Sequence, residues 1–201
     1  MRRVFLLISL FAFSLSLFSQ NDNQAKQILD RTFSAINSSN GIKLTFKGSY
    51  SGELLMKKNK FYLSSNGIKT WFNGKNQWSY VAANDEVNVT TPSVEELQSI
   101  NPYYLLSSYK SGFSYKFIGQ KTINGKKVDS VLLTPLQKSN IMNITIFIAT
   151  DNQPLMINIK EKNGRESSFK VTSYNSKLNL NDTQFIFDKS KYPDAEIIDL
   201  R

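Results

Sequence analysis

The chain has 201 residues, of which 40% are hydrophobic and 12% aromatic, enough for one domain with a sizeable core. It contains neither cysteine nor histidine. Their absence excludes disulfides, thiolate catalysis, a Ser-His-Asp triad and Cys- or His-ligated metals. The formal charge of +9 comes from lysines scattered among the predicted strands and turns, without the concentrated basic arm typical of nucleic-acid binding. We therefore expect no nucleic-acid partner and only transient contact with a membrane surface.

The N-terminus has the pattern of a secretory signal peptide. Arg2 and Arg3 precede an apolar run over residues 4–18, and the polar stretch SQNDNQ follows. An uncleaved membrane anchor is the alternative, but the run is about fifteen residues long where a span needs roughly 20. We predict a signal peptide over residues 1–19 and a single domain over residues 20–201. An exported domain without disulfides fits the periplasm of a Gram-negative bacterium.

The mature chain begins with a predicted amphipathic helix and continues as a β-meander. Apolar residues recur at spacings of three and four between Ala25 and Ile36, and Asn40-Gly41 ends this helix. The period then becomes two, which predicts strands over residues 42–46, 52–58, 60–64, 68–72, 77–81 and 86–90. Asn73-Gly74 between two of them is a strong hairpin signal.

Residues 93–112, SVEELQSINPYYLLSSYKSG, interrupt the β pattern with two predicted short helices. Ser93 and Glu96 form a capping box for the first. Asn101 caps the second, with Pro102 at its first position, and Gly112 ends it. The helices carry a continuous apolar stripe, so this insert must cover another apolar surface.

The second half of the chain returns to alternation with period two. Strands are predicted from residue 113, over residues 128–134 and around Ile146, Ile157 and Phe169, with hairpins at Asn124-Gly125 and Asn163-Gly164. Shorter strands are expected between residues 178 and 187, before a polar tail. The total is about eleven antiparallel strands in one sheet that curls towards a barrel, a mainly β fold with few helices.

The chain offers little for catalysis. The remaining acid–base candidates are paired carboxylates, which glycoside hydrolysis can use: Asp85/Glu86, Glu95/Glu96 and Asp194/Glu196/Asp199. Each has an ordinary role at a turn, a helix start or the tail, so we expect neither an enzyme nor a cofactor. The supply of large apolar side chains on strands is more unusual. A curled sheet of this size encloses more volume than its side chains fill, and the helical insert would close it as a lid over a hydrophobic cavity.

Five segments in order resemble the LolA-like family of periplasmic outer-membrane lipoprotein carriers: GELLMKKNKF at 52–61, WFNGKNQWSYVAANDEVNV at 71–89, INPYYLLSSYKSGFSYKF at 100–117, LLTPL at 132–136 and FIFDKSKYPDAEIIDLR at 185–201. The resemblance implies an unclosed antiparallel β-barrel with helices over its mouth. It also implies a carrier that collects lipoproteins from an inner-membrane release transporter, shields their acyl chains and passes them towards an outer-membrane acceptor. We expect it to act as a monomer.

The cavity and lid point to particular residues. For the sheet side we expect Phe46, Phe61, Leu63, Trp78 and Tyr80, and for the lid Leu97, Ile100, Tyr104 and Leu105. In members of the family, a basic-Pro element with an Arg just after the G-x-L strand tethers the lid. Here this segment reads Lys57-Lys58-Asn59-Lys60, which makes Lys57 and Lys58 the candidates for the latch.

Three alternatives remain open at this point. The same fold could carry a glycolipid or another lipid, or it could be a module that senses mislocalised lipoproteins and contacts a membrane regulator. An enzyme that uses the paired carboxylates is the third.

Overall fold

The computed structural model describes residues 22–100 and 102–201, except for the side chains of Glu95, Ser99, Ile100 and Pro102. The predicted signal peptide and the predicted cap Asn101 lie outside the described residues. Within the described part, none of the helices has the length and apolarity that a membrane crossing needs.

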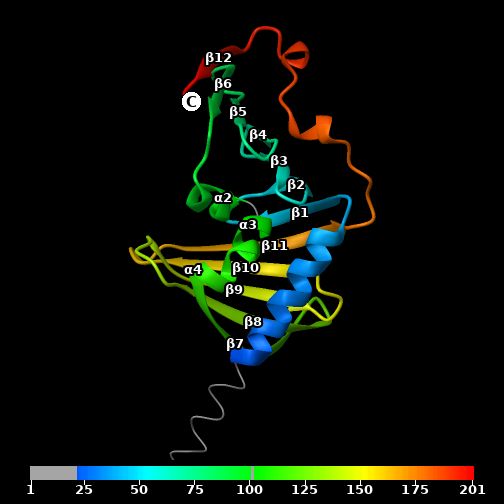
Figure 1. Ribbon diagram of the computed structural model, residues 1–201, viewed down its shortest axis with the longest axis vertical. Coiled ribbons are helices and arrows are strands. Elements are labelled where there is room, and N and C mark those ends of the chain that lie inside the picture. Colours follow the sequence, from blue (N-terminus) through cyan, green and yellow to red (C-terminus); the bar gives the residue numbers. More distant parts are fainter. Residues whose placement is uncertain (1–21, 101) are drawn as a thin grey trace, which may run out of the picture.

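The described residues form one large sheet of twelve strands (Figure 1), in the order β12-β6-β5-β4-β3-β2-β1-β11-β10-β9-β8-β7. The strands are β1 Ile42–Gly48, β2 Gly52–Lys57, β3 Lys60–Ser65, β4 Ile68–Phe72, β5 Gln77–Val81, β6 Glu86–Thr90, β7 Phe113–Ile123, β8 Lys126–Pro135, β9 Ile141–Ala149, β10 Pro154–Glu161, β11 Glu166–Asn175 and β12 Glu196–Asp199. Hairpins connect β1 through β6 and β7 through β11. The antiparallel pairing of β1 with β11 joins these two meanders into a single surface. The predicted mainly β fold with an unclosed sheet is therefore confirmed.

The tight hairpins use the turn chemistry that the sequence indicates. Asn124 and Gly125 both have positive φ, of 51° and 74°, as a two-residue turn between strongly twisted strands requires. Asn66 and Gly67, between β3 and β4, have the same conformation, with φ of 50° and 76°. These turns set the register of their strands and hence the face that each side chain occupies.

The C-terminal segment differs from the prediction. The strands expected between residues 178 and 187 are wrong: this part is extended chain followed by the 3₁₀ helices η1 (Asp182–Phe185) and η2 (Lys189–Lys191). Asn181 begins η1 with a capping box, which favours a helical turn over strand pairing. The tail then pairs in parallel with β6 as β12, a strand that the sequence did not indicate.

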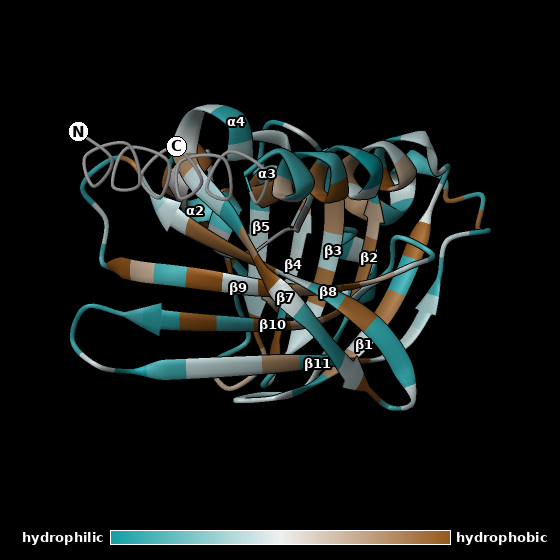
Figure 2. Cartoon of the chain, turned by 90° about the horizontal axis from the view of Figure 1, so that it is seen from below, coloured by the Kyte–Doolittle hydropathy of each residue, from teal (hydrophilic) through white to brown (hydrophobic). Residues whose placement is uncertain are grey.

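The α-helices lie across one face of the sheet (Figure 2). They are the N-terminal helix (residues 22–38) and the insert formed by α2 (Val94–Ile100), α3 (Pro102–Ser107) and α4 (Tyr109–Gly112). The main core contains Ile28 and Leu29 of the N-terminal helix, Leu106 and Tyr109 of the insert, and the inward side chains of β1–β4, β8 and β9. We call this helix-covered side of the sheet the concave face and the opposite side the outer face.

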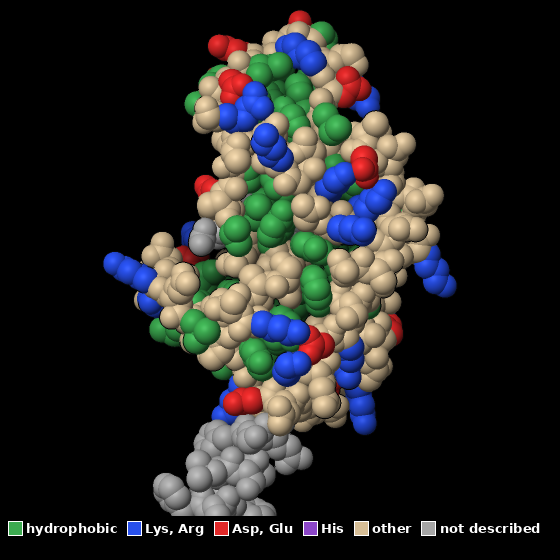
Figure 3. Space-filling model, viewed as in Figure 1, with side chains coloured by type: hydrophobic (Ala, Val, Ile, Leu, Met, Phe, Trp, Pro, Cys, Tyr) green, Lys and Arg blue, Asp and Glu red, His purple; other side chains and the backbone are tan. Residues whose placement is uncertain are grey.

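The N-terminal helix is fixed to the concave face by charge as well as by apolar packing. Arg31 Nη2 donates to Asp129 Oδ2 at 2.5 Å, and Gln120 donates to the other oxygen of this carboxylate at 2.9 Å. Only 8% of the Asp129 side chain is exposed, so its charge requires these partners. On the face shown in Figure 3, Lys and Arg side chains are scattered and do not gather in one patch.

Candidate ligand-binding cavity

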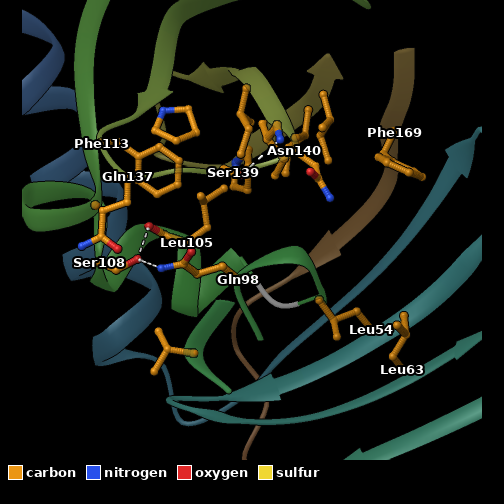
Figure 4. Close-up of a pocket in the computed structure, with 18 of the residues that line it drawn as sticks. Leu54, Leu63, Gln98, Leu105, Ser108, Phe113, Gln137, Ser139, Asn140 and Phe169 are labelled. Carbon is orange, nitrogen blue, oxygen red and sulfur yellow. Dashed lines mark hydrogen bonds between the residues drawn. The ribbon is translucent and has the colours of Figure 1, made fainter. Parts of the chain in front are cut away.

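A cavity of about 830 Å³ lies between the concave face of the sheet and the helical insert. Its walls come from β1–β3 and β7–β11 on the sheet side, and from α2, α3 and α4 on the other. The loop of residues 136–140, between β8 and β9, completes the wall. Figure 4 shows this arrangement, with Leu54 and Leu63 facing the space from the sheet and Leu105 and Gln98 from the insert.

The sheet wall is apolar because alternate residues of each strand point inward. Leu44 of β1, Leu54 of β2 and Leu63 of β3 are aligned by the strand register. Ile157 and Ile159 of β10, together with Val171 of β11, continue the same surface. The alternation that predicts half-buried strands thus also produces a continuous hydrocarbon wall.

An aromatic cluster bounds one part of the cavity. The rings of Phe46, Tyr50 and Phe169 pack edge to face, with centroid distances between 4.6 and 6.0 Å. Tyr50 lies in the loop after β1, and 40% of it is exposed. This cluster offers an apolar contact surface that reaches from the cavity to solvent.

The insert is a three-part lid rather than the two helices predicted. Ser93 and Glu96 form the predicted capping box of α2, with hydrogen bonds of 2.7 and 3.3 Å. The second predicted helix is divided at Ser108, whose hydroxyl donates to the Tyr104 carbonyl at 2.7 Å. Gln98 of α2 donates to the same hydroxyl at 2.8 Å, so Ser108 joins the three short helices.

A single carboxylate anchors the end of the lid to the N-terminal helix. The Tyr109 hydroxyl donates to Asp30 Oδ1 at 2.7 Å, and Lys110 Nζ lies 2.9 Å from the same oxygen. Lys26 donates to Asp30 Oδ2 at 2.7 Å. These donors, Lys26 first and Tyr109 second, hold the pKa of Asp30 well below its usual range. Asp30 is a functional candidate that the helical periodicity alone did not indicate.

A second contact ties the middle of the lid to the turn between β2 and β3. The Tyr104 ring packs against Phe72 at 6.0 Å, and its hydroxyl lies beside the Asn59 side chain. Tyr104 is partly buried, and this burial raises the pKa of its hydroxyl. The latch was expected in this segment, and the residue that reaches the lid there is Asn59.

The predicted latch residues occupy other positions. Lys57 Nζ donates to the Leu180 carbonyl at 2.9 Å and lies 3.2 Å from Asp182 Oδ1, so it holds the C-terminal segment and not the lid. Lys58 occupies the turn with φ of 52°, and among the described residues its side chain makes no hydrogen bond or ion pair with the lid. The expected placement of Lys57 at the lid is wrong. Successive side chains of β2 point to opposite faces of the sheet, and Lys57 points to the outer face, away from the lid.

Of the predicted ligand-binding residues, Phe46, Leu63 and Leu105 line the cavity. Three other candidates belong to the core around it. Phe61 is completely buried against Phe72 at 5.5 Å, and Leu97 is 4% exposed. Tyr104 packs on the same core from α3. The side chain of Ile100 lies outside the described residues.

Trp78 and Tyr80 lie on the outer face, so their predicted placement on the cavity side is wrong. Leu63 is opposite Thr70 and Thr70 is opposite Ser79, which puts Ser79 on the concave face and its neighbours in β5 on the other. Tyr80 packs against Tyr192 of the C-terminal segment at 4.6 Å.

The carboxylate candidates have structural surroundings. The parallel pairing of β12 with β6 places Glu196 beside Glu86, and Asn84 donates to Glu86 Oε2 at 2.6 Å. Asp199 is bonded by Arg201, whose guanidinium lowers the pKa of this carboxyl to about 2. None of these carboxylates is among the described residues that line the cavity.

The loop of residues 136–140 is part of the cavity wall that sequence reasoning missed. Gln137, Lys138, Ser139 and Asn140 line the cavity together. As a polar loop between two strands they carry no sequence signal of a site, since most such loops only face water.

Three comparisons place the chain among known proteins. No curated protein matches it. Among solved structures, an uncharacterized conserved protein from Thermus thermophilus has a TM-score of 0.65 at 14% identity, covering 88% of this chain and 99% of that one. A domain from Vibrio parahaemolyticus, named for outer membrane lipoprotein sorting, has a TM-score of 0.51 at 10% identity, covering 82% and 97%. At these identities the likeness shows the shared fold. The model of the family described as "Outer membrane lipoprotein carrier protein LolA" matches residues 15–165, and the chain belongs to this family.

Proposed function

We propose that this protein is a periplasmic carrier that binds the acyl chains of lipoproteins in the cavity and ferries them from the inner towards the outer membrane. The observation that carries the proposal is the apolar cavity of about 830 Å³ beneath a helical lid. Its volume lies within the ~300–1,000 Å³ of sites that enclose small ligands. The match of the family model over residues 15–165 supports the same role.

Acyl-chain binding needs no reactive group, only apolar surface that is removed from water. Each methylene that moves from water into the cavity contributes about 0.8 kcal/mol. The inward side chains of β1, β2, β10 and β11 supply that surface without breaking any backbone hydrogen bond. The carrier thus shields hydrocarbon by shape and hydrophobicity alone.

The lid limits how tightly the cargo is held. Leu105 projects into the cavity from α3, so an entering chain competes with the lid for the same sheet surface. The lid is anchored by a few polar contacts, at Asp30 and Asn59, and by ring packing at Phe72. Part of the free energy of cargo binding is therefore used to displace the lid, which lowers the net affinity for cargo. An acceptor with a higher affinity can then take the cargo without ATP hydrolysis at this protein.

The remaining elements of the role belong to the same proposal. Export follows from the predicted signal peptide, and the donor and acceptor are an inner-membrane lipoprotein-release transporter and an outer-membrane receptor. Contact with membrane surfaces is transient, because the basic side chains are dispersed (Figure 3). The protein acts as a monomer and without a catalytic step.

A cavity-filling variant tests the proposal. Val171→Phe adds bulk to the wall, while Thr172→Phe places the same ring at an exposed position one residue along. The purified mature protein is titrated with a synthetic acylated lipopeptide and with the fluorophore Nile red. If the added ring displaces roughly two methylenes, affinity falls about tenfold for Val171→Phe, and Thr172→Phe binds like the unmodified protein.

Equal affinities for the two variants, or no uptake by the unmodified protein, would contradict the proposal. Mass spectrometry of cargo that co-purifies from the native periplasm then identifies the lipid. Recovery of a glycolipid or phospholipid without lipoprotein would replace the lipoprotein role with carriage of that lipid.

A further inference from the structure

Most of the polar residues that line the cavity lie on one side of it. Gln137, Lys138, Ser139 and Asn140 form one stretch of its wall, and Gln98 with Ser108 lies near them on the insert (Figure 4). Leu54, Leu63 and Phe169 lie on the other side of the same view. A ligand that fills this space meets hydrocarbon at one end and hydrogen-bonding groups at the other.

The backbone of the polar loop is held in place at three points. The Leu136 amide donates to the Gly112 carbonyl at the end of α4, at 2.9 Å. The Lys162 amide donates to the Asn140 carbonyl at 2.8 Å, and the Ile141 amide donates to the Ser139 hydroxyl at 3.1 Å. The loop is thus pre-organised between the lid and the β10–β11 turn, which reduces the entropy that a ligand must remove.

Apart from Ser139, the polar side chains of this loop are not used to hold it. Among the described residues, no hydrogen bond or ion pair is recorded for the side chains of Gln137, Lys138 or Asn140. Two amide groups and one ammonium supply seven N–H donors in total by their chemistry. They line the cavity from a fixed backbone and are also exposed to solvent, so these donors are free to bind a group of the ligand.

Charge at the loop is positive. Among the described residues that line the cavity, Lys138 is the only charged one. Lys162 contacts the loop through its backbone. The carboxylate of the same turn, Glu161, is already bonded by Arg165 Nε at 2.7 Å and so does not neutralise Lys138. The polar end of the cavity therefore favours a negatively charged group over a neutral or cationic one.

We propose that Lys138, with the amides of Gln137 and Asn140, binds an anionic head group, a carboxylate or a phosphate, attached to the acyl chain in the cavity. The inference rests on acyl-chain binding as proposed above and adds the chemical class and orientation of the ligand. In a lipoprotein, whose acylated cysteine carries no such anion, the anionic group is an acidic side chain next to it. The hydrocarbon lies towards Leu54, Leu63 and Phe169, and the charged head stays at the partly exposed loop.

Matched ligands that differ only in head-group charge test this subsite. Displacement of bound Nile red is measured for palmitate, for lysophosphatidate and for methyl palmitate, at a pH well above the carboxyl pKa. Inorganic phosphate alone is the arm that detects binding of a free anion. The variants are Lys138→Gln, Lys138→Glu and the control Lys127→Gln, which removes an exposed lysine of β8 that does not line the cavity.

We expect palmitate and lysophosphatidate to displace the dye at lower concentration than methyl palmitate. Lys138→Gln should weaken both anions about three- to tenfold and leave the ester unchanged. Lys138→Glu should weaken them further, and Lys127→Gln should have no effect. If inorganic phosphate alone displaces the dye, the loop binds a free anion, and this result would overturn the head-group role.

Equal displacement by the ester and the anions, or no response to Lys138→Glu, would refute the head-group site while leaving acyl-chain binding intact. If none of the ligands displaces the dye, or the dye itself does not bind, acyl-chain binding fails and the subsite fails with it. Methyl palmitate therefore distinguishes the two failures, because it displaces the dye when only the head-group site fails and does not displace it when acyl-chain binding fails.

Discussion

Replacing Asp30 with Asn tests whether one carboxylate holds the lid to the N-terminal helix. The carboxylate collects donors from Lys26, Tyr109 and Lys110 at 2.7–2.9 Å. Asp30→Asn keeps the size of the side chain and removes its charge. The Tyr109 hydroxyl, on a residue only 1% exposed, then loses a charge-assisted acceptor and retains at best a neutral one.

The expected loss of stability follows from these surroundings. A hydrogen bond to a charged group contributes about 1.5–3 kcal/mol when it is well buried. The Asp30 side chain is 36% exposed, so water screens part of this interaction, and the two lysine pairs contribute at most about 1 kcal/mol each. We therefore expect Asp30→Asn to lower the free energy of unfolding by about 1–2 kcal/mol. Asp194→Asn, which removes an exposed carboxylate elsewhere, is the control and should change it little.

The effect also has a defined pH dependence. Because the folded-state pKa of Asp30 is lowered, its contribution is complete above the unfolded pKa of about 3.9 and is lost as the pH falls towards the folded value. The stability difference between the unmodified protein and Asp30→Asn should therefore be constant near neutral pH. It should shrink as the pH falls below about 4.

Urea unfolding of a double-mutant cycle with Tyr109→Phe measures the contact itself. The Phe variant keeps the ring packing against Tyr115, at 5.2 Å, and removes the hydroxyl. We expect a coupling energy of about 1 kcal/mol and faster uptake of Nile red in both single variants. Additive effects of the two substitutions, together with unchanged uptake, would show that the Asp30–Tyr109 bond does not restrain the lid.

Three further predictions concern the latch, the faces of the sheet and the core. Asn59→Ala should speed dye uptake by freeing Tyr104 of the lid. Lys57→Ala should leave uptake unchanged and increase proteolysis of the C-terminal segment. The reverse result would restore Lys57 as the latch. Leu63→Ala should lower dye affinity and Trp78→Ala should not, provided that circular dichroism shows both variants folded; equal losses would place the tryptophan at the cavity. Phe61→Ala should cost about 3–5 kcal/mol in urea unfolding because the ring is fully buried, and a loss below about 1 kcal/mol would contradict that packing.

The strands and the existence of a lid could be predicted because they depend on local patterns. Alternation with period two identified eleven strands, and the capping box at Ser93 fixed the start of the insert. The face of each side chain in β5 could not be predicted in the same way. Both faces of this part of the sheet are covered, one by the core and one by the C-terminal segment, so the large apolar side chain of Trp78 marks a covered face that is not the cavity side.

Contacts between distant segments account for the other differences. The C-terminal aromatics look like strand residues, but Phe187 and Tyr192 pack on Trp71 of the outer face at 5.4 and 5.8 Å. The lid contact of Asn59 depends on where α3 lies, which no local pattern specifies. The polar loop at Lys138 gains its candidate role only when the fold places it against an apolar wall.

The open sheet has a consequence for how the protein remains separate from its own copies. A sheet that does not close leaves edge strands, whose free backbone groups invite pairing with another chain. At one edge lies the four-residue β12, too short to template a long partner. The other edge, β7, is eleven residues long and carries Lys116, Lys121 and a bulge at Gly119, where φ is 112°. Charges and a bulge discourage edge-to-edge aggregation, so the sheet can stay open to cargo without polymerising.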